Sequence, residues 1–438
     1  MEFAVGVLIV AAGLIVSIAL HEIGHLVPAK KFGVKVPQYM VGFGPTLWSK
    51  TVNGTEYGVK ALPLGGFVRL VGMFPPARAG ARVRTRRDGR PGMVEEARAA
   101  ALEELGPGEE HRAFYRLSVP KKMVVMLGGP LMNLLIAAVL MGVVAVGLGI
   151  GQYTTTLGSV QQCVPEDPQA TECTETDPVA PGAQAGLQPG DEIVTWGGTD
   201  VDSWEEISAT IASGGTGPTQ VEVIRDGEHE TLTVAPTPHE RPVVDDEGTP
   251  VRSDDGEIVT ETRPYVGIGP TFELVRQPVT AVPGLVWDLF SRTVHIVVTL
   301  PERLVDVAEA AFGTAERDPG VVGLIGVGRF AGEIASVEGQ GYGLAERSAD
   351  MMGLIVSVNM ALFVFNLVPL LPLDGGHIAG ALWEGLRRRL AMWRHAPDPG
   401  PVDTAKLLPA TYVVIAFMLG MTVLLAYADI VRPVSLSG

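Results

Sequence analysis

Two histidines near the N-terminus, His21 and His25, lie four residues apart, and Glu22 follows the first of them. Residues four apart share one face of an α-helix, so both imidazoles can reach a single metal ion. This His-Glu-x-x-His pattern is typical of zinc sites in which the glutamate takes a proton from metal-bound water. Because the pattern also arises by chance, the interpretation requires a third ligand elsewhere in the chain.

The composition indicates a membrane protein. The chain has 438 residues, 47% of them hydrophobic, with a mean hydropathy of +0.27, and the apolar residues are clustered in long runs. Ionisable residues inside such runs are costly and indicate function, which strengthens the case for the histidine pair. A formal net charge of −16 argues against a nucleic-acid partner, which requires a basic surface.

The first apolar run, about residues 3–26, is long enough to cross a bilayer. A signal peptide is the rival interpretation, but no basic residue precedes the run and no convincing cleavage site follows it. Positive charge instead follows the run at Lys30, Lys31 and Lys35, so the positive-inside rule places its C-terminal end in the cytoplasm. The metal pattern is therefore predicted near the cytoplasmic face.

The remaining runs complete a prediction of four transmembrane helices. About half of all Lys and Arg lie between the first two spans, which indicates a cytoplasmic loop. Residues 34–73 of this loop suggest short strands with glycine-containing turns, and residues 75–108 suggest a mobile or partly helical segment. Residues 279–345 are apolar at helical spacing but carry charges such as Asp288, Arg292 and Asp306, so amphipathic interfacial helices are expected there.

The third span leads into Asp374 and then into a cluster of arginines that places this end in the cytoplasm. Asp374 is thus expected at the depth of His21 and His25, where a carboxylate as third ligand leaves the fourth zinc position for water. On geometry alone His377 and Glu384 compete with it. The second span carries Asn133, which is either part of a kinked, closely packed helix or a polar group serving the metal site.

The region 153–276 is acidic and has no lysine, as expected for a soluble domain outside the membrane. It holds the only cysteines, Cys163 and Cys173, which are either disulfide-bonded or two free thiols. The stretch from Pro181 to Val194 resembles a PDZ domain of the bacterial protease type, which binds an extended peptide by adding a strand at a sheet edge. Its peptide groove is expected at a loop formed by Leu157, Gly158, Ser159 and Val160, and residues 240–261 suggest a long acidic hairpin loop.

Several motifs together resemble the site-2 protease family of intramembrane zinc metalloproteases, in its RseP-like branch. They are His21-Glu22-x-x-His25, Leu373-Asp374-Gly375 after a span carrying Asn366 and Pro369, Gly129-Pro130-x-x-Asn133, Gly42-Phe43-Gly44, and the inserted PDZ sequence. The stretches 41–48 and 406–412 further resemble actinobacterial members. A well-known enterobacterial relative carries two PDZ domains, whereas this chain has room for one.

The resemblance implies a set of roles. His21, His25 and Asp374 would bind one Zn2+, and Glu22 would be the catalytic base. Substrate would contact Asn366 and an edge of the cytoplasmic β-hairpin, and the expected substrate-binding residues are Asn366, Pro369, Gly42, Phe43, Gly44, Gly65 and Gly66. Substrates would be single-pass membrane proteins already trimmed outside by another protease, such as anti-sigma factors. The alternative is a catalytically inactive, membrane-anchored PDZ scaffold that binds envelope proteins.

The predicted fold class is a polytopic α-helical membrane protein with four transmembrane helices, a membrane-associated β-hairpin region and an inserted extracytoplasmic PDZ domain. It would lie in a bacterial cell membrane, with both termini outside and the active site near the cytoplasmic side. The expected parts are transmembrane helices at 1–27, 123–151, 352–371 and 406–428, cytoplasmic loops at 28–122 and 372–405, the PDZ domain at 153–276, interfacial helices at 279–345 and an outer tail at 429–438.

Overall fold

The computed structural model describes residues 1–77, 91–164, 173, 177–243, 253, 259–313, 317, 320–337 and 342–434. The chain divides into two compact units. Unit 1 comprises Met1–Leu148 and Gln277–Gly438, and unit 2 comprises Gly149–Arg276. Each unit is described by itself. Residues 78–90 of the loop predicted to be mobile lie outside the described residues.

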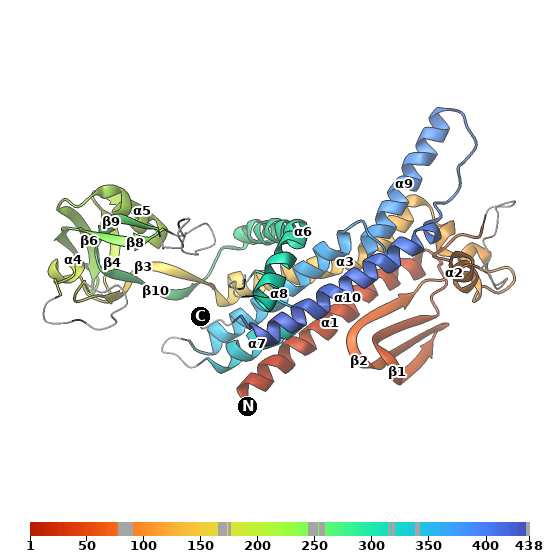
Figure 1. Cartoon of the computed structure of the whole chain (residues 1–438), viewed down its shortest axis with the longest axis horizontal. Coiled ribbons are helices and arrows are strands. Elements are labelled where there is room, and N and C mark those ends of the chain that lie inside the picture. The colour runs from red at the N-terminus through yellow and green to blue at the C-terminus, as the bar shows by residue number, and fades with distance from the viewer. Residues whose placement is uncertain are drawn as a thin grey trace. The chain divides into compact units, whose positions relative to one another are not determined.

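Unit 1 is mainly helical (Figure 1). Helices α1, α3 and α10 run roughly along one another, and helix α9 extends away from them (Figure 1). The helices are α1 (Glu2–Lys31), α2 (Met93–Leu102), α3 (Val119–Gly142, continued by a π-helical segment Val143–Leu148), α6 (Val282–Phe312), α7 (Leu324–Ser336), α8 (Leu344–Leu367), α9 (Asp374–Trp393) and α10 (Leu408–Val431).

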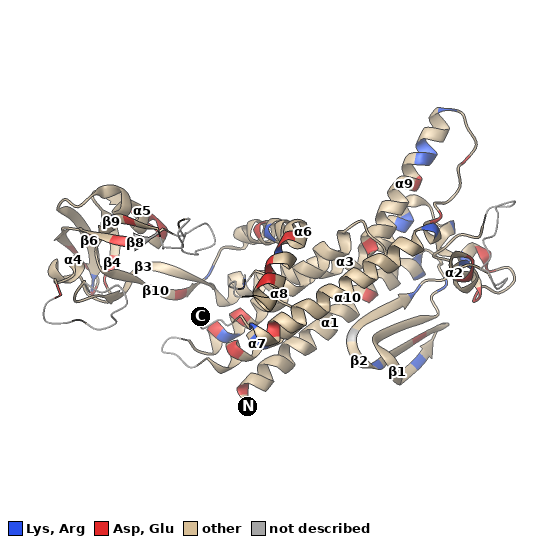
Figure 2. Ribbon diagram, in the orientation of Figure 1, with Lys and Arg blue, Asp and Glu red and all other residues tan. Residues whose placement is uncertain are grey.

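Five helical segments of the described chain are long and apolar enough to cross a membrane: Glu2–Lys31, Val119–Leu148, Val279–Phe312, Leu344–Leu367 and Thr404–Val431. Four of them coincide with predicted spans. The fifth contains α6, in the region where interfacial helices are expected, so the predicted count of four spans is not confirmed. Helix α6 has 31 residues, more than the roughly 20 that a span needs. Charged residues are distributed along α6 (Figure 2), and its interfacial position stays a prediction.

One β-hairpin forms the β region of unit 1. Strands β1 (Gln38–Val52) and β2 (Thr55–Arg69) have 15 residues each and pair antiparallel with several shifts of register, so that residues 38–41 lie opposite both residues 56–59 and residues 66–69. The turn is Asn53-Gly54, where both residues have positive φ, as tight hairpin turns require. The β region predicted within residues 34–73 is therefore confirmed, but its strands are two long, irregular ones rather than several short ones. Gly42 and Gly44, with φ of 95° and 83°, lie where the strand pairing shifts register rather than in turns.

Helices α1 and α3 cross in close contact through two glycines. A Cβ on Gly24 would lie 2.2 Å from the carbonyl oxygen of Gly128, and a Cβ on Gly128 would lie 2.0 Å from that of Gly24. Neither position can carry a side chain without moving a helix backbone. Small residues allow this approach in membrane helices, and it brings the His-Glu-x-x-His end of α1 against α3.

The described residues of unit 2 form an antiparallel β structure with two helices, α4 and α5. Its main sheet has the order β10-β3-β4-β6-β7, with β5 paired to β4, and a second sheet pairs β8 with β9. The elements are β3 (Ile150–Val160), α4 (Pro181–Gln184), β4 (Glu192–Trp196), β5 (Thr199–Asp200), α5 (Trp204–Gly214), β6 (Thr219–Arg225), β7 (Glu228–Val234), β8 (Thr237–Pro242), β9 (Thr260–Tyr265) and β10 (Ile268–Val275).

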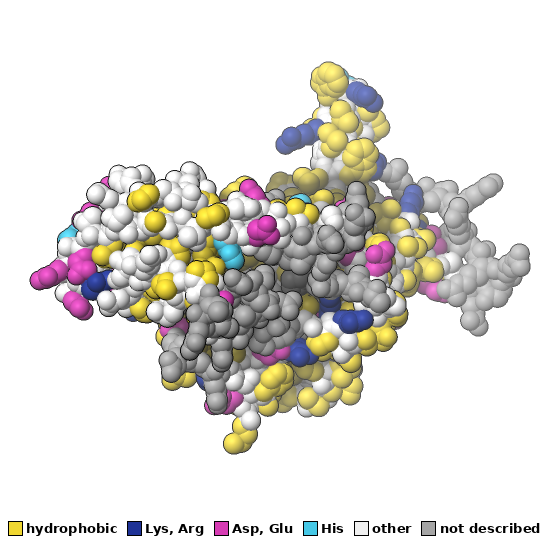
Figure 3. All heavy atoms as spheres, turned by 60° about the vertical axis from the view of Figure 1, so that its left-hand side comes forward, with side chains coloured by type: hydrophobic (Ala, Val, Ile, Leu, Met, Phe, Trp, Pro, Cys, Tyr) yellow, Lys and Arg dark blue, Asp and Glu magenta, His cyan; other side chains and the backbone are white. Residues whose placement is uncertain are grey.

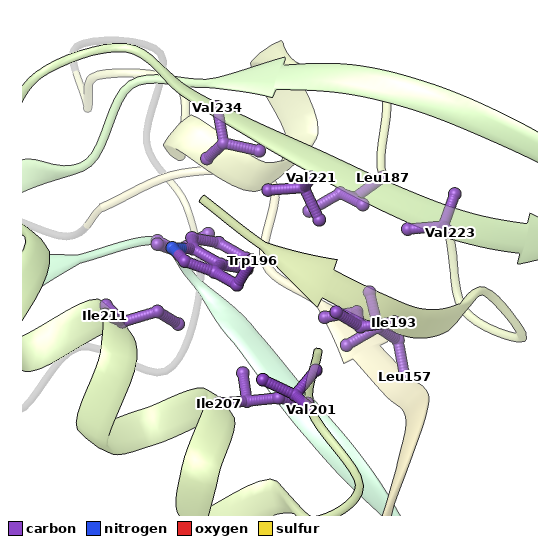
Figure 4. Close-up of a cluster of buried hydrophobic side chains, with 11 residues drawn as sticks. Leu157, Leu187, Ile193, Trp196, Val201, Ile207, Ile211, Val221, Val223 and Val234 are labelled. Atoms are coloured by element: carbon purple, nitrogen blue, oxygen red, sulfur yellow. The ribbon is translucent and has the colours of Figure 1, made fainter. Parts of the chain in front are cut away.

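The core of unit 2 gathers apolar side chains from the sheet and from α5 around Trp196 (Figure 4). Leu157 belongs to this core and is only 1% exposed. Residues 157–160 lie in strand β3, with Leu157 opposite Pro270 and Val160 opposite Ile268 of β10. The expectation of a loop there is therefore wrong, because the segment pairs as a strand. Most of the predicted acidic loop, residues 244–252 and 254–258, lies outside the described residues.

A disulfide and a buried ion pair cross-link described residues of unit 2. A disulfide joins Cys163 to Cys173. Asp191, from the Gly190-Asp191 end of the PDZ-like stretch, accepts two hydrogen bonds of 2.7 Å from the guanidinium of Arg225. It also accepts one from the backbone N–H of Gln188 at 2.9 Å. These bonds hold the loop before β4 against the end of β6.

Candidate metal centre

Three ligand atoms converge where α1 meets the start of α9. The Nε2 atoms of His21 and His25 lie 3.2 Å apart. Oδ2 of Asp374 lies 3.3 Å from Nε2 of His21 and 3.2 Å from Nε2 of His25. The i, i+4 spacing on α1 supplies two corners of this triangle, and the first residue of α9 supplies the third.

The triangle has the dimensions of one face of a zinc tetrahedron. Ligand atoms at about 2.0–2.1 Å from zinc are separated by roughly 3.3–3.4 Å in tetrahedral geometry. Nδ1 of His21 and Oδ2 of Asp374 are buried and have no hydrogen-bond partner in the described part of the chain. Buried polar atoms without partners are costly, and a bound cation would satisfy the carboxylate. The residues present therefore fit a metal ion.

The structure distinguishes among the three candidates for the third ligand. Within the described ranges, His21, His25 and Asp374 are the one group of at least three His, Cys, Asp or Glu side chains that could hold a metal ion. Glu384 instead forms a buried ion pair with Lys122 at 2.8 Å. His377 lines a small cavity beside this pair. Only Asp374 joins the histidines.

Backbone contacts orient the ligands. Nδ1 of His25 lies 2.8 Å from the carbonyl oxygen of Val125 on α3, so Nδ1 carries the proton and Nε2 offers its lone pair. Two glycines after Asp374 allow the first turn of α9 to pack closely against the backbone that precedes it. A Cβ on Gly375 would lie 2.2 Å from the carbonyl oxygen of Val368, and one on Gly376 would lie 2.6 Å from the backbone nitrogen of Leu371.

The hairpin reaches the metal centre at Glu22. A Cβ on Gly66 of β2 would lie 3.1 Å from Cγ of Glu22, so any larger residue here would press on this side chain. Tyr39 of β1 donates a hydrogen bond of 2.9 Å to the carbonyl oxygen of Ala19, two residues before His21. Burial raises the pKa of Tyr39 to about 12, and the charge of Glu22 adds to this effect, so the hydroxyl stays a donor. The hairpin is thereby fixed to α1 beside the site.

The hairpin residues predicted to bind substrate form one cluster. The rings of Phe43 and Phe67 stack at 6.2 Å between centroids. A Cβ on Gly65 would lie 2.6 Å from the ring of Phe43, and one on Gly42 would lie 2.7 Å from the carbonyl oxygen of Leu62. Gly65 and Gly66 are adjacent, so the cluster adjoins Glu22. The structure thus brings the predicted hairpin residues together with the predicted base.

An apolar cavity of about 660 Å3 opens next to this cluster. Residues of α1, α7, α8 and α10 line it, together with Pro63 of β2, Asn366 and Leu373. Asn366 is half-buried, and its side-chain nitrogen donates to the carbonyl oxygen of Leu362 at 3.0 Å. Pro369 does not share this cavity; it lines a separate groove between α9 and α10. The predicted pair of Asn366 and Pro369 is therefore divided between two surfaces.

Comparison with known proteins agrees with this geometry. The sequence profile of "Peptidase family M50" matches residues 9–395. The chain belongs to peptidase family M50. It is 34% identical to the zinc metalloprotease Rip1 of Mycolicibacterium smegmatis over 447 residues, and 32% identical to Rip1 of Mycobacterium tuberculosis H37Rv over 446, with all of each chain covered. It is 26% identical to the metalloprotease MmpA of Caulobacter vibrioides, with 85% of each chain covered.

The predicted resemblance to the site-2 protease family is confirmed by this membership. Family M50 membership and the five apolar helices make the chain a multi-pass membrane protein. Enzymes of this class are metalloendopeptidases, and the His21, His25 and Asp374 triangle is the place in the described chain where a metal fits.

One residue of this M50 site was missed by the sequence analysis as a part of the metal centre. A Cβ on Gly129 of α3 would lie 2.1 Å from Nε2 of His25 and 2.7 Å from Nε2 of His21. The sequence marked Gly129 only as part of the Gly129-Pro130-x-x-Asn133 motif. No local pattern in α3 indicates contact with side chains over a hundred residues earlier. Gly129 forms the floor beneath the two imidazoles.

Asn133 lies one turn beyond Gly129 on the same face of α3. It is 0% exposed, and neither its side-chain nitrogen nor its oxygen has a hydrogen-bond partner among the described residues. Buried amides without partners are rare in native structures. Its service to the metal site stays a prediction.

Proposed function

We propose that the chain is an intramembrane zinc metalloprotease that hydrolyses peptide bonds within the transmembrane segments of single-pass membrane proteins. The observation that carries the proposal is the triangle of His21, His25 and Asp374 with Glu22 beside it, next to an apolar cavity. Membership of family M50 and full-length relatives named zinc metalloproteases support zinc as the metal.

His21, His25 and Asp374 would hold the zinc. Bound zinc lowers the pKa of its water to about 7 and polarises the scissile carbonyl. Glu22 would act as the base that takes a proton from the water attacking the carbonyl carbon. The same carboxylate then gives the proton to the amide nitrogen as the carbon–nitrogen bond breaks, so the products are a carboxylic acid and an amine.

A helical substrate must unwind before this step, because its carbonyls are hydrogen-bonded within the helix and lipid offers no substitute. The cavity lined by α1, α7, α8 and α10 has room for apolar side chains. The hairpin cluster around Phe43, Gly65 and Phe67 supplies a strand edge that would hold the unwound segment extended. Asn366, on the cavity wall, would hydrogen-bond the exposed substrate backbone.

The orientation we propose puts the metal centre near the cytoplasm and unit 2 and both termini outside. Lysines follow the metal motif on α1, and arginines fill the last half of α9. The Cys163–Cys173 disulfide supports an oxidising compartment for unit 2.

We further propose that unit 2 is a PDZ domain that admits substrates only after another protease has trimmed them, as with anti-sigma factors. A peptide groove at residues 157–160 does not fit, because β3 is paired with β10 along them. The strand beside helix α5 that could receive a peptide is β9, whose partner in its own sheet is β8. Deleting residues 155–275 should remove the dependence on prior trimming; cleavage still strictly dependent on it would contradict this role.

The test of the catalytic assignment is Glu22→Gln in the purified full-length chain. We expect zinc to remain bound and hydrolysis of a single-span substrate to cease, since the amide cannot accept the proton. Retained turnover would refute the role of Glu22. The competing function is an inactive PDZ scaffold; a parent chain that carries no zinc after mild purification would favour the scaffold. Comparing the membrane proteomes of parent and Glu22→Gln cells would identify substrates as single-span fragments that accumulate in the variant.

A further inference from the structure

A basic cavity of about 750 Å3 lies in unit 1, beside the N-terminal ends of α3 and α10. Its walls come from α2, the segment before α3, α9 and the chain between α9 and α10. Five basic side chains line it but only two acidic ones; the basic residues are Arg98, Arg116, Arg387, Arg388 and Lys406.

Two of these arginines are not neutralised. Arg98 pairs with Asp403 and with Glu95, and Arg388 pairs with Glu384. In the part of the chain that the structure describes, no carboxylate lies within ion-pair distance of Arg116 or Arg387; the latter donates only to a backbone carbonyl at 3.4 Å. Free guanidinium groups in a cavity favour an anion, and their planar donors match a phosphate.

An apolar groove of about 360 Å3 adjoins this cavity. It lies between α9 and α10 and is lined by side chains such as Leu371, Trp383 and Val414. The two spaces share Val402 in the connection between the helices. From Leu407 to Val414 the groove follows α10 for about 10 Å into the helical span, at 1.5 Å per residue. A basic pocket therefore continues into an apolar slot.

The outer surface of α9 indicates that both spaces lie at the level of lipid headgroups. Apolar and basic side chains alternate on the projecting part of this helix (Figure 3). Trp383 and Trp393 are 54% and 78% exposed, and exposed tryptophan beside arginine is typical of a membrane interface.

We propose that the two adjoining spaces bind one anionic phospholipid, with its phosphate between Arg116 and Arg387 and one acyl chain in the groove between α9 and α10. Basic pockets beside membrane helices bind such headgroups. A soluble phosphate ester would leave the groove empty, and an acidic peptide has no hydrocarbon chain to fill it. Leu371 and Gly376 on the groove wall flank Asp374 in the sequence, so the lipid would brace the segment that carries this ligand.

The test is native mass spectrometry of the full-length chain released from vesicles of phosphatidylglycerol mixed with phosphatidylcholine. We expect the parent chain to retain phosphatidylglycerol over phosphatidylcholine. Arg116→Gln combined with Arg387→Gln should reduce this retention at least tenfold. Arg389→Gln is the matched control, because this exposed arginine is on the same helix but does not line the cavity.

The groove is tested separately, with the basic cavity intact. Ala410→Trp, which fills the groove, should weaken phosphatidylglycerol retention at least fivefold, whereas Ala416→Trp on the exposed face of α10 should leave it unchanged. Equal retention of both lipids by the parent overturns the proposal. So does displacement of the lipid by glycerol phosphate or by an acidic peptide at equal concentration, which would assign the cavity to a soluble anion or to a protein segment.

Discussion

Gly129→Ala should disturb the metal ligands while leaving the packing of α3 intact. It therefore tests the metal centre more specifically than replacing a ligand does. The added methyl carbon would lie 2.1 Å from Nε2 of His25, where ordinary contact begins at 3.4 Å. The imidazole must therefore move by about 1.3 Å, whereas metal–ligand distances tolerate changes of about 0.2 Å. His25 cannot move freely either, because Nδ1 is held by the carbonyl oxygen of Val125 at 2.8 Å.

The expected magnitude follows from the loss of one ligand. Removing an outer-shell partner of a ligand reduces metal affinity about 10- to 100-fold. Losing the ligand itself should reduce metal affinity at least a hundredfold, which corresponds to about 2.7 kcal/mol. Alanine is otherwise favoured over glycine in a helix interior by about 1 kcal/mol. The variant should thus lose zinc and turnover without a matching loss of helix stability.

The assay is zinc content per chain together with zinc affinity by competition against a chelator, with thermal unfolding measured in the same detergent. Gly142→Ala on the same helix is the control, since its nearest neighbour would be a Val282 methyl at 4.0 Å. Gly128→Ala is the opposite control, because its Cβ would meet a backbone oxygen of α1 at 2.0 Å and should lower the melting temperature. Full zinc content in Gly129→Ala, with affinity within threefold of the parent, would refute the reasoning.

Three further substitutions test other contacts, two at the metal centre and one in unit 2. Gly66→Ala brings a Cβ to 3.1 Å from Cγ of Glu22 and should lower turnover about tenfold, or roughly 1.4 kcal/mol in the barrier, with zinc retained; unchanged turnover would contradict the contact. Gly375→Ala, blocked at 2.2 Å by the carbonyl oxygen of Val368, should displace Asp374 and halve or abolish zinc content; normal content would be the contrary result. Asp191→Asn leaves Arg225 without its buried partner and should destabilise unit 2 by about 3 kcal/mol, measured by hydrogen exchange of residues 149–276 in the full chain. Burial alone would raise the pKa of Asp191, but the bonds from Arg225 and Gln188 lower it below its usual range. The stability from this pair is therefore complete above about pH 4 and disappears at lower pH; equal acid sensitivity of parent and Asp191→Asn would show that the pair is not its source.

The parts of the site that were predictable depend on short-range geometry. His21 and His25 share a helix face because of their spacing alone, and that expectation needs no tertiary contact. Asp374 could be predicted as a ligand because the positions of the charged residues indicate the membrane depth at which a span ends. His377 and Glu384 stayed open because the depth of a residue does not determine where its side chain points. In the described structure Asp374 is the one of the three that joins the two histidines, and Glu384 pairs with Lys122 instead.

The parts that were not predictable depend on contacts between distant segments. Gly129 and Gly66 matter because of what lies opposite them, and nothing in their own neighbourhood distinguishes them from packing glycines. Residues 157–160 were expected to form a loop because PDZ-like domains place a loop for a chain terminus at this point of the sequence. Pairing with β10, over a hundred residues later, instead makes them part of a strand. Helix α6 combines a long apolar run with charges, so composition alone supports both a span and an interfacial helix.

The position of the hairpin constrains where a substrate helix would be cut. The apolar cavity is lined by Val7 and Val10 toward the start of α1 and by Pro63 and Leu373 at the metal centre. A helix lying along the cavity keeps its own hydrogen bonds until it reaches the hairpin, because the cavity walls are mostly apolar. Beside Gly65 and Gly66, strand β2 pairs with β1 on one side, with Gly66 opposite Val41, and its other edge would offer replacement bonds. Unwinding is therefore least costly at this end, so cleavage is expected within the last turns of the substrate span beside Glu22 rather than at its middle.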